Sequence, residues 1–236
     1  MRILLAGGSG YVGTMVTPYL KADHTLRVLD PAPPKDPAVE YVQGSVADIA
    51  AVRHALEGIE GVVYMAMPRT REGGYDVRDI DVNYDIHVKH LHRVLLAAAE
   101  AKIARAVYTS SMSVYLHRPP GFPDGEDTPA DAPDLYGFTK RLGEIVCDYF
   151  ARVHKMTAVS LRLNGPMSLE DWQRAARAGH VLGQTAAPDV ASAIALSLTA
   201  PLAGAHIFNI TGDYVGRYCL CTRAKELLGW EPLARP

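Results

Sequence analysis

Short apolar runs alternate with longer amphipathic segments along most of the chain. A run bounded by turn residues is typical of a buried strand, whereas apolar positions spaced three and four residues apart are typical of a helix. The predicted strands are Ile3–Ala6, Thr25–Asp30, Val39–Gln43, Gly61–Ala66, Arg105–Ser110, Met156–Leu163 and Ala205–Ile210.

Helical patterns fill the intervals between these strands. The first runs from a glycine-rich turn to Leu20, and Pro18 is expected to kink or shorten it. Others cover Asp48–Glu57, Asp79–Ala101 and Leu135–Val153. Because strand, helix and strand follow in this order, we expect an α/β fold, a Rossmann-type doubly wound parallel sheet with helices on both faces.

The glycines at the first turn suggest a phosphate-binding loop. Gly7, Gly10 and Gly13 follow the first predicted strand and open the first helix, and Asp30 ends the second strand. Such a turn lets the backbone and the helix amides approach a pyrophosphate, and an acid at the second strand reaches ribose hydroxyls and repels a 2′-phosphate. This pattern predicts NAD rather than NADP. An ordinary glycine turn, and an aspartate that only shapes the turn before a proline, are the alternatives.

Composition narrows the class of protein. The 236 residues carry 24 Lys+Arg against 26 Asp+Glu, so no basic excess indicates nucleic acid or an anionic membrane surface. Three cysteines are too few for a disulfide framework, and the apolar run at the amino terminus is too short for a signal peptide or a membrane span. We therefore expect a cytoplasmic protein.

A tyrosine, a lysine and a serine are candidates for catalysis. Tyr136 and Lys140 are four residues apart on a predicted helix, so they share a face, and Ser111 follows the strand that ends at Ser110. A free tyrosine has a pKa near ~10, and a base useful near neutral pH needs it lowered by roughly three units, which a neighbouring ammonium favours. A surface pair of Tyr136 and Lys140 is the alternative.

Motifs across nearly the whole chain resemble those of the extended short-chain dehydrogenase/reductase family of NAD-dependent epimerases and dehydratases. They are, in order, AGGSGYVG, YTSSMSVY, EDTPADAPDLYGFTK, SLRLNGP, and more weakly APDVASAI, HIFNITG and AKELLGWEP. The resemblance implies that Tyr136 is the general acid/base, that Lys140 binds the nicotinamide ribose and lowers the pKa of the tyrosine, and that Ser111 polarises the substrate oxygen. The residues that it implies for NAD binding are Gly7, Gly10, Tyr11, Val12, Gly13, Asp30, Ser45, Val46, Met65, Ala66, Met67, Asn83, Tyr136, Lys140 and Pro166.

Departures from the family pattern narrow the expected reaction. Met112-Ser113 stands where the dehydratases have an Asp-Glu pair, which argues against dehydration, and Gly44-Ser45 replaces the usual Gly-Asp near the adenine. The chain is similar to compact members that oxidise a small acidic sugar with NAD. Candidate substrate contacts are Ser111, Met112, Ser113, Asn164 and Arg174, although Arg174 also fits a solvated helix arginine. Asn83 also fits a buried residue that packs its helix.

The sequence therefore predicts an NAD-binding domain at 1–166 and a small substrate-binding cap at 167–236. The expected function is an NAD-dependent oxidoreductase for a small polar substrate of the sugar or sugar-acid type. A nucleotide-sugar epimerase and a non-catalytic dinucleotide-binding regulator are the alternatives. Homodimerisation through Asp79–Ala101 and Leu135–Val153 is expected from the resemblance. No metal is expected, because His87 and His90 lack acidic or cysteine partners at ligand spacing. The acidic, proline-rich stretch His117–Asp134 fits a solvated surface loop or a lid.

Overall fold

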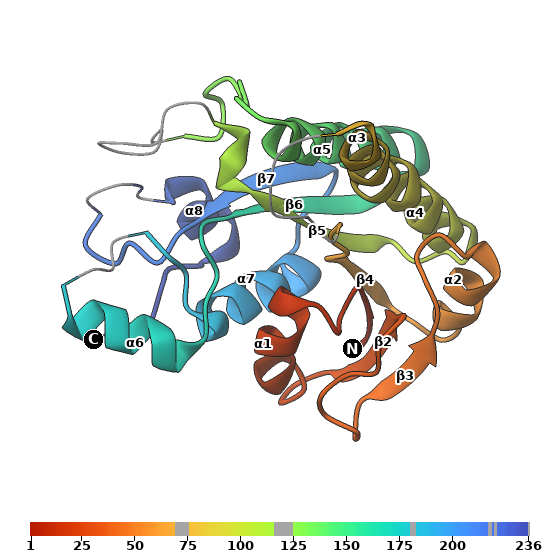
Figure 1. Cartoon of the computed structure of the whole chain (residues 1–236), viewed down its shortest axis with the longest axis horizontal. Coiled ribbons are helices and arrows are strands. Elements are labelled where there is room, and N and C mark those ends of the chain that lie inside the picture. The colour runs from red at the N-terminus through yellow and green to blue at the C-terminus, as the bar shows by residue number, and fades with distance from the viewer. Residues whose placement is uncertain (69–75, 116–124, 180–182, 217–218, 220, 236) are drawn as a thin grey trace.

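The centre of the molecule is a sheet of seven parallel strands in the order β3-β2-β1-β4-β5-β6-β7 (Figure 1). This computed structural model describes residues 1–68, 76–115, 125–179, 183–216, 219 and 221–235. The expected α/β fold with a doubly wound parallel sheet is confirmed. The strands are β1 (Arg2–Ala6), β2 (Thr25–Asp30), β3 (Glu40–Gln43), β4 (Gly61–Tyr64), β5 (Arg105–Ser111), β6 (Thr157–Leu163) and β7 (Ala205–Ile210).

Helices cover both faces of the sheet. In Figure 1, α1 and α7 lie together on one side, and α2, α4 and α5 lie on the other. The α-helices are α1 (Tyr11–Leu20), α2 (Ile49–Ala55), α3 (Val77–Tyr84), α4 (Leu91–Glu100), α5 (Leu135–His154), α6 (Leu169–Arg177), α7 (Ala187–Thr199) and α8 (Thr222–Leu228).

Strand β1 shows how the sequence builds two cores. Its side chains point alternately to opposite faces, as the pleat of a strand requires. Ile3 and Leu5 are fully buried in the core that contains residues of α1 and α7, whereas Leu4 and Ala6 are buried in the core that contains residues of α2, α4 and α5. A strand covered on both faces is apolar at nearly every position, which explains the apolar run Ile3–Ala6.

The long helix expected over Asp79–Ala101 is interrupted. A π-helical stretch, Asp85–His90, joins α3 to α4. Within it, the Ile86 carbonyl accepts a 2.6 Å hydrogen bond from the hydroxyl of Tyr64 on β4. Pro18 lies within α1, near its last residue, Leu20.

The residues after Pro166 contribute to the same layers as the residues before it. Strand β7 pairs with β6, and α7 packs against α1. A smaller core forms around Trp172 of α6. The division at residue 166 stays a prediction, and the first part of the predicted loop or lid, residues 117–124 with His117, lies outside the described residues. Within the described part of the chain, no helix is long and apolar enough to cross a membrane.

Candidate active site

A cleft of about 830 Å³ opens at the carboxyl ends of the strands. It lies where the strand order reverses, because β1 is followed along the chain by β2 on one side, whereas its other neighbour is β4. Open α/β sheets bind ligands at such a switch point. The segments that follow the six strands β1 to β6 line the cleft, together with α5. Among its lining residues, the charged side chains are those of Asp30 and Lys140.

The turn after β1 requires glycine at its first position. Gly7 has a φ of +85°, and a Cβ built on it would lie 2.5 Å from Cα of Ala66, which follows the neighbouring strand β4. Its amide donates a 2.9 Å hydrogen bond to the carbonyl of Leu29 on β2. The chain after β1 therefore passes close to β4 and β2, and Gly7 lines the floor of the cleft without a side chain that would fill it.

The start of α1 fits a pyrophosphate. Gly10 caps the helix without a side-chain hydrogen bond, and the first turn contains no acidic residue. Gly10, Tyr11 and Val12 all line the cleft. Uncapped amides and the positive end of a helix dipole attract phosphate groups, so this end of α1 suits the phosphates of a dinucleotide.

Asp30 stands at the wall of the cleft where β2 ends. One carboxylate oxygen accepts a 3.2 Å hydrogen bond from the Ser9 amide, and the other accepts a 3.0 Å bond from the Ala32 amide. These two bonds fix the carboxylate beside the glycine turn. In that position it can accept hydrogen bonds from ribose hydroxyls and would repel a 2′-phosphate. Together with the helix start, it makes the residues of this half of the cleft fit NAD.

Ser111, Tyr136 and Lys140 meet in the other half of the cleft. The Ser111 hydroxyl accepts a 3.1 Å hydrogen bond from the Ser113 amide, so its own hydrogen is available for a substrate oxygen. Lys140 Nζ lies 5.8 Å from the centre of the Tyr136 ring and donates a 2.7 Å hydrogen bond to the Thr109 carbonyl. The three groups come from the end of β5 and the first turns of α5.

A glycine allows α5 to approach the serine segment. A Cβ built on Gly137, the residue after the tyrosine, would lie 2.1 Å from the carbonyl oxygen of Ser113. Asp134 caps the helix by accepting a 2.7 Å hydrogen bond from the Gly137 amide. The cap and the close approach together bring the first turn of α5, with Tyr136, against the segment that follows Ser111.

Burial lowers the pKa of two groups near the tyrosine, Lys140 and His87. It lowers the pKa of Lys140 to about 7, against the opposing effect of the Glu144 carboxylate. It also lowers the pKa of His87 to about 2, with a further contribution from the Lys140 ammonium. The His87 ring lies 5.7 Å from the Tyr136 ring, and its Nδ1 is 2.9 Å from the Thr139 hydroxyl. His87 is therefore neutral at physiological pH.

Most of the predicted site residues line this one cleft. The predicted positions that do so are Gly7, Gly10, Tyr11, Val12, Asp30, Ser45, Val46, Met65, Ala66, Met67, Ser111, Ser113, Tyr136, Lys140, Asn164 and Pro166.

Four predicted residues lie elsewhere. Gly13 is buried within α1, and Met112 is buried in the core that contains residues of α1 and α7. Asn83 is buried, and its amide donates a 2.8 Å hydrogen bond to the Asp79 carbonyl of its own helix. Arg174 pairs at 2.8 Å with Glu170 and with Asp171, both on its own helix. The side chain of Arg174 is 67% exposed, so it has the solvated position of the alternative interpretation rather than a place in the cleft.

Several lining residues were not predicted. Ser9, Ala32 and Thr109 each lie within two residues of a predicted position at a strand end, so their nearness to the strand ends was the signal that could have found them. Ile86 lines the cleft from the π-helical stretch, for which the sequence pattern gave no signal.

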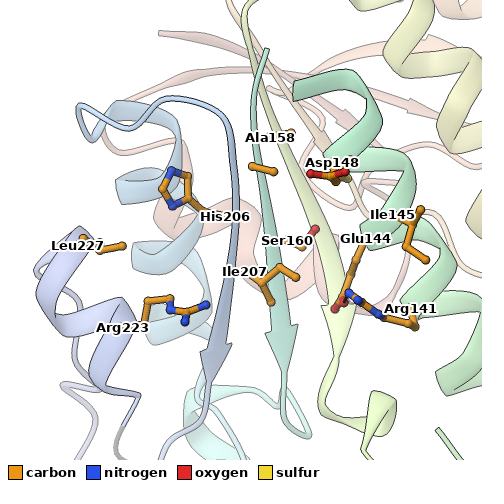
Figure 2. A pocket seen from close by; sticks show the side chains of 12 residues that line it. Arg141, Glu144, Ile145, Asp148, Ala158, Ser160, His206, Ile207, Arg223 and Leu227 are labelled. Carbon is orange, nitrogen blue, oxygen red and sulfur yellow. Dashed lines mark hydrogen bonds and ion pairs between the residues drawn. The ribbon is translucent and has the colours of Figure 1, made fainter. Parts of the chain in front are cut away.

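A second cavity of about 470 Å³ lies between α5 and α8, over β6 and β7 (Figure 2). Arg141, Glu144 and Asp148 line it from α5, and Arg223 lines it from α8. Within the described residues, no group of three or more His, Cys, Asp or Glu side chains is arranged to hold a metal ion.

Comparisons with known proteins identify the family of the chain. The model of the NAD dependent epimerase/dehydratase family matches residues 3–187. The 3β-hydroxysteroid dehydrogenase/Δ5→4-isomerase of Mycobacterium tuberculosis is 34% identical over 121 residues, which are 49% of this chain and 33% of that protein. The chain thus spans about a third of the length of that relative.

Two solved structures share the fold over 98% of this chain with a TM-score of 0.80. One is a short-chain dehydrogenase/reductase superfamily protein of Agrobacterium tumefaciens with bound NAD, which is 23% identical and 92% covered. The other is a mutated uronate dehydrogenase, which is 17% identical and 81% covered. Because the family model matches most of the chain, the protein belongs to the NAD-dependent epimerase/dehydratase family of extended short-chain dehydrogenases/reductases.

Proposed function

We propose that the protein is an NAD-dependent oxidoreductase that acts on a hydroxyl or carbonyl group of a small polar substrate, of the sugar or sugar-acid type. The observation that carries this proposal is the convergence of Ser111, Tyr136 and Lys140 in the cleft that also contains the glycine turn and Asp30. NAD, when bound, accepts or supplies the hydride.

In the proposed reaction the chain's own residues orient the substrate and move a proton. The Tyr136 hydroxyl exchanges a proton with the substrate oxygen. Ser111 donates a hydrogen bond to the same oxygen and stabilises the charge that develops on it. Lys140, in its protonated form, stabilises the tyrosinate. Its hydrogen bond to the Thr109 carbonyl keeps the ammonium near Tyr136.

The proposed substrate is small and polar because of the side chains around the catalytic group. Ser113 and Asn164 line the cleft near Ser111 and can hydrogen-bond hydroxyl groups. The name of the mycobacterial relative indicates a hydroxysteroid, which is also a secondary alcohol but an apolar one.

An epimerase is the second candidate within the family. The serine, tyrosine and lysine required for oxidation would also serve an enzyme that oxidises a nucleotide sugar and reduces it again. Such an enzyme keeps its NAD through purification and forms no net NADH. A non-catalytic dinucleotide-binding regulator would bind NAD and turn over none of these substrates.

We also propose that the protein works in the cytoplasm as a homodimer that pairs through α4 and α5. The support for the dimer is the family resemblance of these helices together with exposed apolar side chains along α5, among them Phe138, Tyr149 and Val153. The support for the compartment is the small number of cysteines, three in the whole chain.

A panel of substrates tests the proposed function. NADH absorbance is followed with sugars, uronic acids, hydroxy acids, nucleotide sugars and a hydroxysteroid, with NADP in parallel. The proposal expects turnover of a sugar or sugar acid that the Tyr136→Phe variant lacks, although this variant still binds NADH by calorimetry. Interconversion of a nucleotide sugar without release of NADH would contradict this proposal and show an epimerase. NADH binding with no turnover of any substrate in the panel would favour the non-catalytic regulator.

A further inference from the structure

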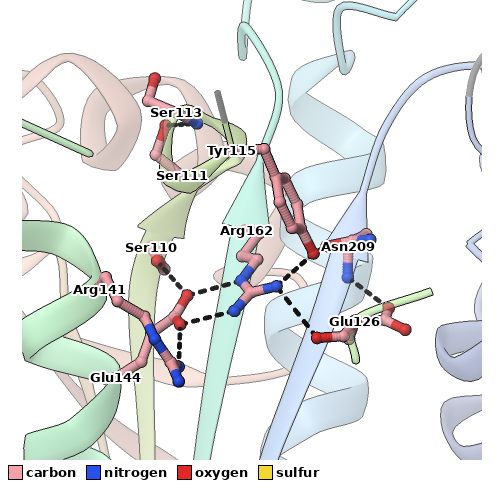
Figure 3. Close-up of polar contacts among 9 residues, drawn as sticks. All are labelled: Ser110, Ser111, Ser113, Tyr115, Glu126, Arg141, Glu144, Arg162 and Asn209. Atoms are coloured by element: carbon pink, nitrogen blue, oxygen red, sulfur yellow. Dashed lines mark hydrogen bonds and ion pairs between the residues drawn. The ribbon is translucent and has the colours of Figure 1, made fainter. Parts of the chain in front are cut away.

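A buried ion pair stands directly behind the catalytic lysine. Both carboxylate oxygens of Glu144 accept 2.8 Å hydrogen bonds from the Arg162 guanidinium, one from Nε and one from Nη2 (Figure 3). The Glu144 side chain is 0% exposed and that of Arg162 is 1% exposed. Burial lowers the pKa of Arg162, but the hydrogen bonds and the charge of Glu144 outweigh that effect and raise it, so the guanidinium keeps its charge.

The same carboxylate also contacts strand β5. Glu144 Oε1 accepts a 2.7 Å hydrogen bond from the Ser110 hydroxyl, and Oε2 accepts a 2.8 Å bond from Arg141. One turn earlier on α5, Lys140 donates its hydrogen bond to the carbonyl of Thr109. Helix α5 therefore holds two consecutive residues of β5, and the next residue is Ser111.

Arg162 extends these contacts from α5 toward the edge of the sheet at β7. Its Nη1 donates hydrogen bonds to the Tyr115 hydroxyl and, at 3.4 Å, to the Glu126 carbonyl (Figure 3). The Glu126 carboxylate accepts a 2.7 Å hydrogen bond from the Asn209 amide on β7. A single guanidinium thus connects α5, the segment after β5 and the chain that leads to Tyr136.

We propose that Glu144 is a positioning residue for the active site: held by Arg162, its carboxylate locks α5 to the end of β5, keeps Lys140 and Ser111 in place, and supplies the negative charge facing the buried ammonium. The role assigned to Lys140 and Ser111 in this inference rests on the proposed function. The contacts that define the lock do not.

Among the described residues around the ammonium, Glu144 is the acidic one that affects its charge. His87 faces Lys140 from the π-helical stretch and is neutral. The Tyr108 ring lies 5.0 Å from Nζ on the β5 side, and burial raises the pKa of its hydroxyl, so it is also neutral. Tyr136 completes the set from α5. Removing the negative charge of Glu144 also leaves the positive charges of Arg162 and Arg141 uncompensated. Both effects destabilise the protonated form of Lys140 and lower its pKa.

A titration of Lys140 that needs no substrate tests the inference. Lysine side chains are isotopically labelled, the Lys140 signal is assigned by its loss in Lys140→Met, and its midpoint is followed by NMR. Glu144→Gln is expected to lower that midpoint by about one pH unit or more. With a substrate from the panel, kcat is expected to fall about tenfold or more while KM changes less than about threefold.

Asp148→Asn is the matched control. It removes a carboxylate one turn further along α5, where Asp148 pairs at 2.8 Å with Arg152 and is 49% exposed. Its Lys140 midpoint and its kcat should equal those of the wild type. If Glu144→Gln does not fold, Glu144→Asp takes its place, because it keeps the charge but shortens the side chain. Glu144→Asp is expected to lower kcat and to leave the midpoint nearly unchanged.

The outcomes separate this inference from the proposed function. A folded Glu144→Gln variant whose Lys140 midpoint and kcat match the wild type would overturn the inference, and so would a folded Glu144→Asp variant with unchanged kcat. A lowered midpoint in a protein that turns over no substrate in the panel would support the electrostatic effect of Glu144 on Lys140 while the proposed function fails.

Discussion

Lys140 donates a 2.7 Å hydrogen bond to the carbonyl of Thr109, two residues before Ser111. The bond joins the ammonium on α5 to the strand that carries the serine, and the surrounding chain buries the lysine almost completely. This burial lowers the pKa of Lys140 to about 7. The charge on which the proposed reaction depends is therefore sensitive to small changes of pH.

The first prediction concerns this charge. Lys140→Met is expected to reduce kcat by about a hundredfold or more, because the tyrosinate loses its stabilising cation. In the wild type the help from the ammonium is present below a pH of about 7 and is lost as pH rises through that value. A pH profile of kcat for the two proteins checks this, and parallel profiles would contradict it.

Gly7→Ala is expected to abolish NADH binding and to destabilise the fold. The φ of +85° disfavours a side chain, and the new Cβ would lie 2.5 Å from the backbone of Ala66, so the turn must move. The expected loss is about 1–3 kcal/mol in the free energy of unfolding. Gly125→Ala is the control, since a Cβ at Gly125 meets no atom within 4 Å. Calorimetry with NADH and denaturant unfolding measure the two effects, and wild-type affinity in Gly7→Ala would contradict the assigned role of the turn.

Asp30→Asn is expected to shift the cofactor preference from NADH toward NADPH. The carboxylate accepts hydrogen bonds from Ser9 and Ala32 at the cleft wall, and the substitution removes the charge that would repel a 2′-phosphate. The ratio of the two dissociation constants should change by about tenfold or more. Asp36→Asn, which removes a carboxylate paired with Lys21, should leave the ratio unchanged. An unchanged ratio in Asp30→Asn would show that Asp30 only shapes its turn.

His87 should make the fold sensitive to acid. Its pKa is about 2 in the folded protein against 6.5 for an ordinary histidine, so the unfolded chain binds more protons between these values. Stability contributed by the neutral ring is complete above a pH of about 6.5 and is lost as pH falls toward about 2. His87→Gln should therefore show a shallower fall of Tm with acid than the wild type. His54→Gln, at a side chain that is 68% exposed, should behave as the wild type does.

Light scattering at micromolar concentration tests the proposed dimer. The wild type is expected to have the mass of two chains, and Val153→Glu should shift it toward one, because a charge on an apolar contact is costly to bury. Val153 is 52% exposed on α5, and Leu233→Glu, at a position that is 69% exposed, serves as the control. A wild type with the mass of one chain would contradict the proposed dimer.

The sequence pattern predicted the sheet well because buried parallel strands leave an unmistakable apolar run. Thr25–Asp30 and Ala205–Ile210 have the predicted bounds. The cleft followed from the same strands, since ligand-binding turns come at their carboxyl ends. The π-helical stretch was not foreseen, because its apolar spacing also fits an uninterrupted helix.

Residues that act through contacts distant in sequence were harder to predict. Glu144 is separated by 18 residues from Arg162, and a glutamate one turn after a lysine looks like a solvated helix position. Only the packing of α5 against β5 and β6 reveals that both side chains are buried. Arg174 shows the converse difficulty, because the sequence left open a substrate contact and a solvated helix position, and the structure pairs it with Glu170 and Asp171 of its own helix.

The hydrogen bond from the Asn209 backbone amide to Glu126 also protects the edge of the sheet against pairing with another molecule. Strand β7 is the last in the sheet, and the free amides of such an edge invite pairing with a strand of another chain. The Glu126 carboxylate accepts a hydrogen bond from one of those amides, and both Glu126 and Asn209 are buried, so this part of the edge is already covered. Replacing Glu126 would leave this edge amide without its hydrogen bond, and aggregation would be the first consequence.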